Sequence, residues 1–287
     1  MTNSYGVAST YGVQLLCDTT PQIDKAKLLA AIRTRCPGAK FLDGNPNSGL
    51  LAFAHEDHPN QLGIAAQTLV AIADKPIQQA SFKDAIRQSW SFAEATQTIA
   101  GAHASILVTD LMASGLKYAD RLSLFHGALA GVLAAVSCRA IHWQSSQCIV
   151  NPAAFLEAFE QQPSALFFAG ALNVRLFNIS SNPGECVMDT LGLAALGLPD
   201  IQCHFHGLDK AKMARLLYNL GWYIFESGDV IADGQTIDGL TPGSRWICQH
   251  EESIVAPNRI VLDLNPGVGF AAGQRPQDRH VECWAQG

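Results

Sequence analysis

The chain has 287 residues, of which 48% are hydrophobic and 15% charged, and its net charge is −6. This composition is typical of a well-packed globular protein and excludes a disordered one, while the length suits one large domain or two of ordinary size. Because no run of basic residues offers a stripe for phosphates, we expect no direct nucleic-acid binding.

The chain begins with MTNSYGVASTYGVQLLC, which has neither the basic region nor the long apolar core of a signal peptide. The most apolar stretch, Leu122–Val136, is shorter than the ~20 residues that span a bilayer, so we expect a buried helix and no membrane partner. Eight scattered cysteines without a CxxC pair are typical of reduced, mostly buried thiols. We therefore expect a cytoplasmic protein.

In the first half of the chain, apolar runs alternate with segments of helical periodicity. Strands are predicted at 13–17, 50–54, 63–73, 104–110 and 141–143, and helices at 23–36, 117–136 and 151–162. The polar segment HEDHPNQ, residues 55–61, is predicted to be a loop. Ser91 and Glu94 have the spacing of a capping box, and Asn151 followed by Pro152 is typical of a helix N-terminus.

The second half has a similar outline. Strands are predicted at 166–179, 186–188, 201–205, 244–249 and 259–264. Asp209 is predicted to cap a helix that runs to about Glu226, and an irregular, glycine-rich tail is expected from Asn265. Because several strands follow one another directly, the pattern predicts an α+β fold. We expect two α/β sandwich-like halves, residues 1–162 and 163–287, with mostly antiparallel or mixed sheets and helices on one face.

The stretch DIQCHFHG, residues 200–207, carries the densest group of potential metal ligands. Alternation along a strand would place Cys203 toward the core and Gln202, His204 and His206 on the other face. Two such histidines can bind zinc, but zinc needs three or four ligands. The other potential ligands lack a diagnostic spacing; they are His142, Asp189 and His250. We therefore favour a plain surface strand, with His204 and His206 as the metal candidates.

Other catalytic signatures are missing from the sequence. There is no GxSxG elbow, no Walker A lysine pattern and no HExxH. A thiol site that pairs Cys203 or Cys186 with His142 is less favoured than inert buried cysteines, because no obvious positive charge lies nearby. The segment GVGFAAG, residues 267–273, is not followed by a helix that could bind a pyrophosphate. We therefore predict no catalytic residue and no cofactor.

Two pairs of acidic residues, Glu251–Glu252 and Asp229 with Asp233, are interpreted as solvated edges. Such edges can also form a docking patch for a basic partner, since complementary charge speeds encounter and favours specificity. Asp233–Gly234 is interpreted as a structural turn.

The most distinctive stretch is MDTLGLAALGLPDIQCHF, residues 188–205. It resembles the core motif of a bacterial family known as domain of unknown function 4261, with a T-x-G-L-like element followed by G-x-P-[DE]-[IL]. The matching residues are Thr190, Gly192, Leu193, Gly197, Pro199, Asp200 and Ile201. Two further similarities are DGQTI at 233–237 and SILVTD at 105–110, so that the resemblance extends over about residues 10–264.

The resemblance implies no enzymatic activity and no catalytic residues. Members of the family are often found near toxin and type VI secretion loci, which implies an immunity protein that neutralises a cognate toxin. An acidic inhibitor would suit a basic toxin such as a nuclease. Gly192, Gly197 and Pro199 are expected to turn the chain sharply into a strand, and Asp200 to bind backbone amides in that turn.

Two other classes remain open. One is a metal-dependent or hydrolytic enzyme with a site around His204, His206 and Asp189. The other is a chaperone or adaptor for secretion.

Overall fold

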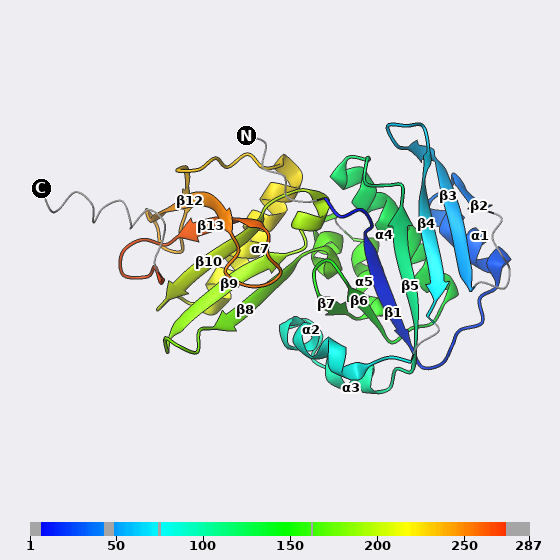
Figure 1. Ribbon diagram of the computed structural model, residues 1–287, viewed down its shortest axis with the longest axis horizontal. Coiled ribbons are helices and arrows are strands. Elements are labelled where there is room, and N and C mark those ends of the chain that lie inside the picture. Colours follow the sequence, from blue (N-terminus) through cyan, green and yellow to red (C-terminus); the bar gives the residue numbers. More distant parts are fainter. Residues whose placement is uncertain (1–6, 43–48, 74–75, 162, 274–287) are drawn as a thin grey trace, which may run out of the picture. The chain divides into compact units, whose positions relative to one another are not determined.

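The computed structural model describes residues 7–42, 49–73, 76–161 and 163–273 (Figure 1). The chain divides into two compact units: unit 1 contains residues 1–173 and 191–198, and unit 2 contains residues 174–190 and 199–287. Each unit is built around its own sheet, and the sheets are mostly antiparallel. The fold class is therefore α+β, as the sequence predicts.

Unit 1 contains a sheet with the strand order β2-β3-β4-β5-β1-β6-β7, in which neighbouring strands run antiparallel. Its strands are β1 (Gly12–Cys17), β2 (Ala39–Leu42), β3 (Leu50–Pro59), β4 (Ala65–Ile72), β5 (Ala104–Leu111), β6 (Ala140–Trp143) and β7 (Cys148–Val150). Its helices are α1 (Lys25–Arg35), η1 (Gln79–Phe82), α2 (Lys83–Gln88), α3 (Ala95–Ala100), α4 (Tyr118–Ala135), α5 (Pro152–Phe159), α6 (Pro163–Leu166), η2 (Phe167–Ala171) and η3 (Ala194–Leu196).

Helix α4 is the central helix of unit 1, and its residues 121–132 are buried except Ser123. It packs closely on α1: a Cβ on Gly131 would come within 2.6 Å of the Cα of Ile32. The prediction of a buried helix here is thus confirmed. None of the helices in the described ranges combines the length and the apolarity that crossing a membrane requires.

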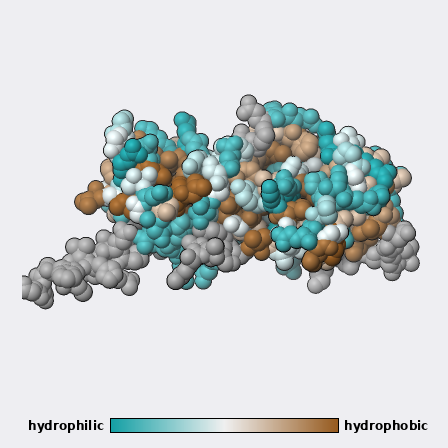
Figure 2. Space-filling model, turned by 90° about the horizontal axis from the view of Figure 1, so that it is seen from above, coloured by the Kyte–Doolittle hydropathy of each residue, from teal (hydrophilic) through white to brown (hydrophobic). Residues whose placement is uncertain are grey.

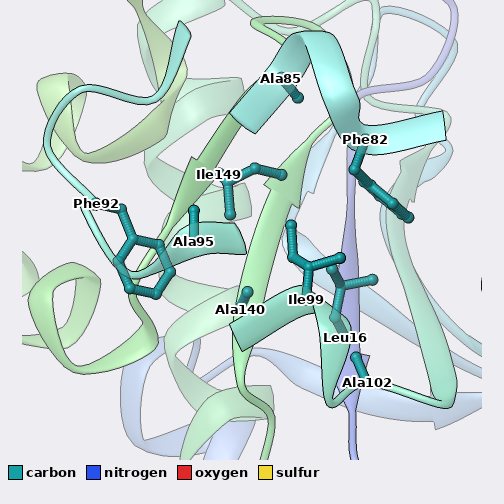
Figure 3. Packing of buried hydrophobic residues seen from close by; sticks show 9 residues of the cluster. All are labelled: Leu16, Phe82, Ala85, Phe92, Ala95, Ile99, Ala102, Ala140 and Ile149. Carbon is teal, nitrogen blue, oxygen red and sulfur yellow. The ribbon is translucent and has the colours of Figure 1, made fainter. Parts of the chain in front are cut away.

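A second group of helices packs on the other face of the same sheet. Since side chains alternate along a strand, Leu15 and Leu16 of β1 point to opposite faces. Leu16 belongs to a buried apolar cluster that α2 and α3 help to close (Figure 3). The members of this cluster are Leu16, Phe82, Ala85, Phe92, Ala95, Ile99, Ala102, Ala140 and Ile149. Strand β6 and the edge strand β7 are therefore covered by short helices on this face.

Two buried histidines in unit 1, His55 and His126, and the half-buried His142 make its stability sensitive to acid. Burial lowers the pKa of His126 to about 3 and the pKa values of His55 and His142 to about 4. His126 packs edge-on against Trp143 at 5.5 Å between ring centroids, in an apolar setting that disfavours a charged ring. In the unfolded chain these rings take up a proton below a pH of about 6.5.

We expect the free energy of unfolding to fall as the pH drops from about 6.5 toward 4, by up to ~1.4 kcal/mol per pH unit for each histidine. The pKa values are depressed in the folded state, so the stability they contribute is complete above the unfolded pKa and is lost as pH falls through this window. His126→Phe should flatten the slope in urea titrations at several pH values. The control His206→Gln changes an exposed side chain and should leave the slope intact; an equal slope for His126→Phe would contradict the prediction.

Unit 2 contains a sheet with the strand order β11-β12-β13-β10-β9-β8 (Figure 1). Its elements are β8 (Asn173–Asn178), β9 (Glu185–Leu191), β10 (Asp200–His206), α7 (Lys210–Ser227), β11 (Thr236–Asp238), β12 (Arg245–Glu252) and β13 (Ile260–Asn265). Strands β10 and β13 run parallel, so the sheet is mixed. The predicted cap of α7 is confirmed, because the Asp209 carboxylate accepts from the backbone N–H groups of Ala211 and Lys212.

Several predicted elements are corrected by the structure. The segment at 55–59 is not a loop, because His55 is buried and its ring contacts Thr68 across the sheet at 2.8 Å, which extends β3 to Pro59. The Ser91 capping box is wrong: α3 begins only at Ala95, after a chain of turns. Residues 163–171 form two short helical elements with a kink at Ala169 and Gly170, so the strand predicted at 166–179 is confined to β8. The short elements β2, β7, β11 and α2 lacked a sequence signal long enough to predict.

Candidate functional site

Four buried charged side chains form a network in the sheet of unit 2. Arg175 on β8 donates to both oxygens of Asp189 on β9, at 3.0 and 2.5 Å. Arg259, just before β13, donates to Asp189 at 2.6 Å and to Asp200 on β10 at 2.9 Å. Each of the four side chains is at most 5% exposed. Since buried charges are costly unless they are paired, the two cations and two anions compensate one another.

Arg259 uses all three of its nitrogens. Besides the two carboxylates, its Nη2 donates to the carbonyl of Thr190 at 2.7 Å, and its Nη1 donates to the carbonyls of Val255 and Pro257 at 3.3 and 2.8 Å. Burial would lower the pKa of Arg259, but the carboxylates of Asp200 and Asp189 raise it on balance. The guanidinium therefore stays charged while it holds the backbone of two segments, strand β9 at Thr190 and the loop at Val255 and Pro257.

The motif residues Thr190 and Asp200 belong to this network. The Thr190 hydroxyl donates to Asp200 at 3.0 Å and accepts from the backbone N–H of Ile201 at 2.8 Å. The structure therefore gives Asp200 a cross-strand role with Arg259 and Thr190, where the sequence suggested a turn-forming one. Gln202, predicted on a polar surface, is fully buried. It donates to Asp263 at 3.2 Å and accepts from the N–H of Ile254 at 2.7 Å.

The charged groups of the network form hydrogen bonds with one another. Each carboxylate oxygen of Asp189 and Asp200 accepts at least one hydrogen bond within the network. A carboxylate that is paired in this way is poorly suited to take or give a proton during catalysis. What the network does is fix the backbone between β12 and β13, where Ile254 is exposed to solvent.

The motif glycines sit where the chain turns into β10. Gly192 has a φ of 137° and Gly197 a φ of 83°, conformations that L side chains rarely adopt. A Cβ on Gly192 would lie 2.0 Å from the carbonyl oxygen of Ala171. Leu198 closes the turn by donating its N–H to Leu193, and Pro199 then leads into the strand. Position 192 thus requires glycine for two reasons, the positive φ and the short distance to the carbonyl oxygen of Ala171.

The two histidines of β10 have different environments. His204 is largely buried, and its Nε2 lies 3.1 Å from Glu185, whereas His206 is exposed. Asp189 pairs with Arg175 and Arg259, whereas His204 contacts Glu185. A Cβ on Gly273 would come within 2.6 Å of the His204 ring, so Gly273 packs on this histidine. Over the residues that the structure describes, no three His, Cys, Asp or Glu side chains are arranged to hold a metal ion.

The acidic pair Asp229 and Asp233 holds a second histidine, His250 of β12. Its Nδ1 lies 2.8 Å from Asp233 and its Nε2 lies 3.1 Å from Asp229. The backbone N–H of His250 also donates to Asp233 at 2.7 Å, and this hydrogen bond lowers the pKa of that carboxyl. Gly234 follows with a φ of 81°. These hydrogen bonds hold the turn predicted at Asp233–Gly234 against β12.

The thiols considered for nucleophilic chemistry are buried. Cys186 and Cys203 lie in the core of unit 2, whereas His142 lies in unit 1 against Phe82. Cys283 falls outside the described residues.

Sequence reasoning missed the arginines at the centre of the network. The available signal was the acidic residue within an apolar run, CVMDTL, because a buried carboxylate requires a cationic or hydrogen-bonding partner. The partner itself is 70 residues away for Arg259 and 14 for Arg175, and only the sheet brings them together.

One comparison with known proteins gave a match, and it covers part of this network. Neither the curated proteins nor the solved structures gave a match. The network residues other than Arg175 fall within one family match, as do the motifs at 190–201 and 233–237, whereas SILVTD lies outside it. Residues 189–265 of this chain match the family described as a domain of unknown function (DUF4261).

Proposed function

We propose that the chain is a cytoplasmic immunity protein that binds and neutralises a cognate bacterial toxin, such as a type VI secretion effector, by protein–protein contact. The observation that supports this proposal most is the distribution of charge. Between residues 216 and 258 there are six acidic residues and one basic residue, Arg245, a net charge of −5 out of −6 for the whole chain. The rest of the chain is nearly neutral, with nineteen acidic and eighteen basic residues.

A local charge of this size favours a basic partner. Complementary potentials raise association rates and disfavour wrong partners. Toxins that act on nucleic acids carry basic surfaces because they bind phosphates, so a nuclease is the toxin class that this charge suits. The acidic stretch also exposes apolar side chains, which give a contact its affinity. On the face drawn in Figure 2, hydrophobic residues reach the surface among hydrophilic ones.

The test is to mix the protein with a purified, catalytically competent toxin encoded beside its gene. We expect one co-eluting complex by size-exclusion chromatography, loss of toxin activity, and weaker binding at high salt, because salt screens exposed charges. Two separate peaks at micromolar concentration would overturn the proposal. A complex in which the toxin stays active would point to a secretion chaperone or adaptor instead.

A further inference from the structure

Two loops of unit 2 lie at the same end of its sheet. One is 253–259, which joins β12 to β13; the other is 228–235, which follows α7. Helix α7 starts beyond the C-terminal end of β10 and runs back along the sheet, so it ends near the start of β10 (Figure 1). Because β10 and β13 are parallel, the start of β13 and the loop before it are at that end too.

Hydrogen bonds fix the backbone of the first loop, residues 253–259. Its ends are joined by the N–H of Ser253 donating to the carbonyl of Arg259 at 2.9 Å, and the Ser253 hydroxyl donates to Pro257 at 3.0 Å. Gln202 accepts from the N–H of Ile254, and Arg259 donates to the carbonyls of Val255 and Pro257. A loop fixed in this way loses little conformational entropy when it binds a partner.

The second loop is held from the side by His250. The contacts with Asp229 and Asp233 flank Val230, whose side chain is 51% exposed. The N–H of Gly234 also donates to the carbonyl of Cys248 on β12 at 2.9 Å. The two loops therefore each present an exposed apolar residue on a fixed backbone, since Ile254 is 49% exposed.

Acidic residues lie close to these apolar residues in the sequence. Glu226 at the end of α7 and Glu252 at the end of β12 are exposed. The single basic residue of the stretch, Arg245, is at the opposite end of β12, where it pairs with Asp238 at 2.9 Å. This end of unit 2 thus combines two exposed apolar side chains with two exposed carboxylates.

We propose that Glu226, Val230, Glu252 and Ile254 form the docking surface for a protein partner that presents apolar side chains ringed by lysine or arginine. This inference rests on the proposed function and names the part of the chain that carries it. Complementary charge sets the encounter, and the two apolar residues provide the buried contact once the partner has docked. The buried arginine–aspartate network and the contacts of His250 with Asp229 and Asp233 position this surface.

The experiment compares Ile254→Ala and Glu252→Lys with matched controls in unit 1, Leu62→Ala and Glu94→Lys, which change exposed side chains. An inactivated form of the toxin encoded beside the gene serves as the probe in surface plasmon resonance. We expect Kd to rise about tenfold for each docking-surface variant and to change less than about twofold for the controls. For Glu252→Lys the association rate should fall, and the fall should shrink at high salt.

The outcomes separate the two proposals. If the wild-type chain binds the toxin while Ile254→Ala and Glu252→Lys both stay within about twofold of it, the docking surface is wrong and the proposed function stands. If the wild-type chain does not bind at all, the proposed function fails and this inference fails with it. Equal circular dichroism spectra and melting temperatures for the four variants would exclude differences in folding as the cause of the differences in Kd.

Discussion

Arg259→Met is expected to lose about 3–5 kcal/mol of the free energy of unfolding, because it removes the cation that two buried carboxylates share. Asp189 would keep Arg175, whereas Asp200 would lose the cation that donates to its Oδ2 and keep the hydroxyl of Thr190 at its Oδ1. Three backbone carbonyls, at Thr190, Val255 and Pro257, would each lose one donor as well. Chemical denaturation with two spectroscopic probes measures this change.

Arg245→Met is the matched control, because Arg245 pairs with Asp238 while its side chain is 62% exposed. Exposed ion pairs contribute little, so this variant should lose less than about 1 kcal/mol. Arg259→Lys should fall near the methionine variant, since an ammonium cannot reproduce the fork that reaches two carboxylates. A stability for Arg259→Met within about 1 kcal/mol of wild type would show that the network is not the support we infer.

Gly192→Ala is the second change with a large expected effect. The φ of 137° is unfavourable for any L side chain, and the new Cβ would meet the carbonyl oxygen of Ala171 at 2.0 Å. That oxygen belongs to the backbone, so relief requires the chain to move. We expect a loss of at least about 3 kcal/mol, measured as the shift in urea midpoint at constant m-value.

Gly184→Ala separates the two causes. Gly184 has a φ of 95°, and a Cβ there would meet nothing within 4 Å, so only the backbone strain remains. Such strain costs about 1–2 kcal/mol. If Gly192→Ala cost no more than Gly184→Ala, the close approach to Ala171 would not be what requires a glycine in the motif.

Arg259 and Gly192 indicate what the motif within the family match does in this chain. Thr190 and Asp200 belong to the Arg259 network, and Gly192 and Gly197 turn the chain between them. The motif therefore builds the frame of unit 2, and the residues proposed to meet a partner lie in the loops that this frame fixes. A binding surface on loops above a rigid sheet can vary while its support is kept.

The sequence by itself determined the features that depend on local periodicity and local hydrogen bonds. The strand at 104–110, the long buried helix around Leu122 and the caps at Asn151 and Asp209 are each encoded within about twenty residues. Strand alternation also placed Cys203 in the core, where it is fully buried. The α+β class followed from the order of such segments along the chain.

The tertiary structure alone decided which charges meet. The sequence placed Gln202 at the surface and linked Asp189 with His204, because an isolated strand has no information about what covers its faces. In the folded chain Arg259 comes from 70 residues away to join Asp189, and Gln202 is buried beneath the loop that it holds. Pairing of buried charges is a long-range condition, satisfied when the sheet assembles, and it is this condition that shapes the exposed end of unit 2.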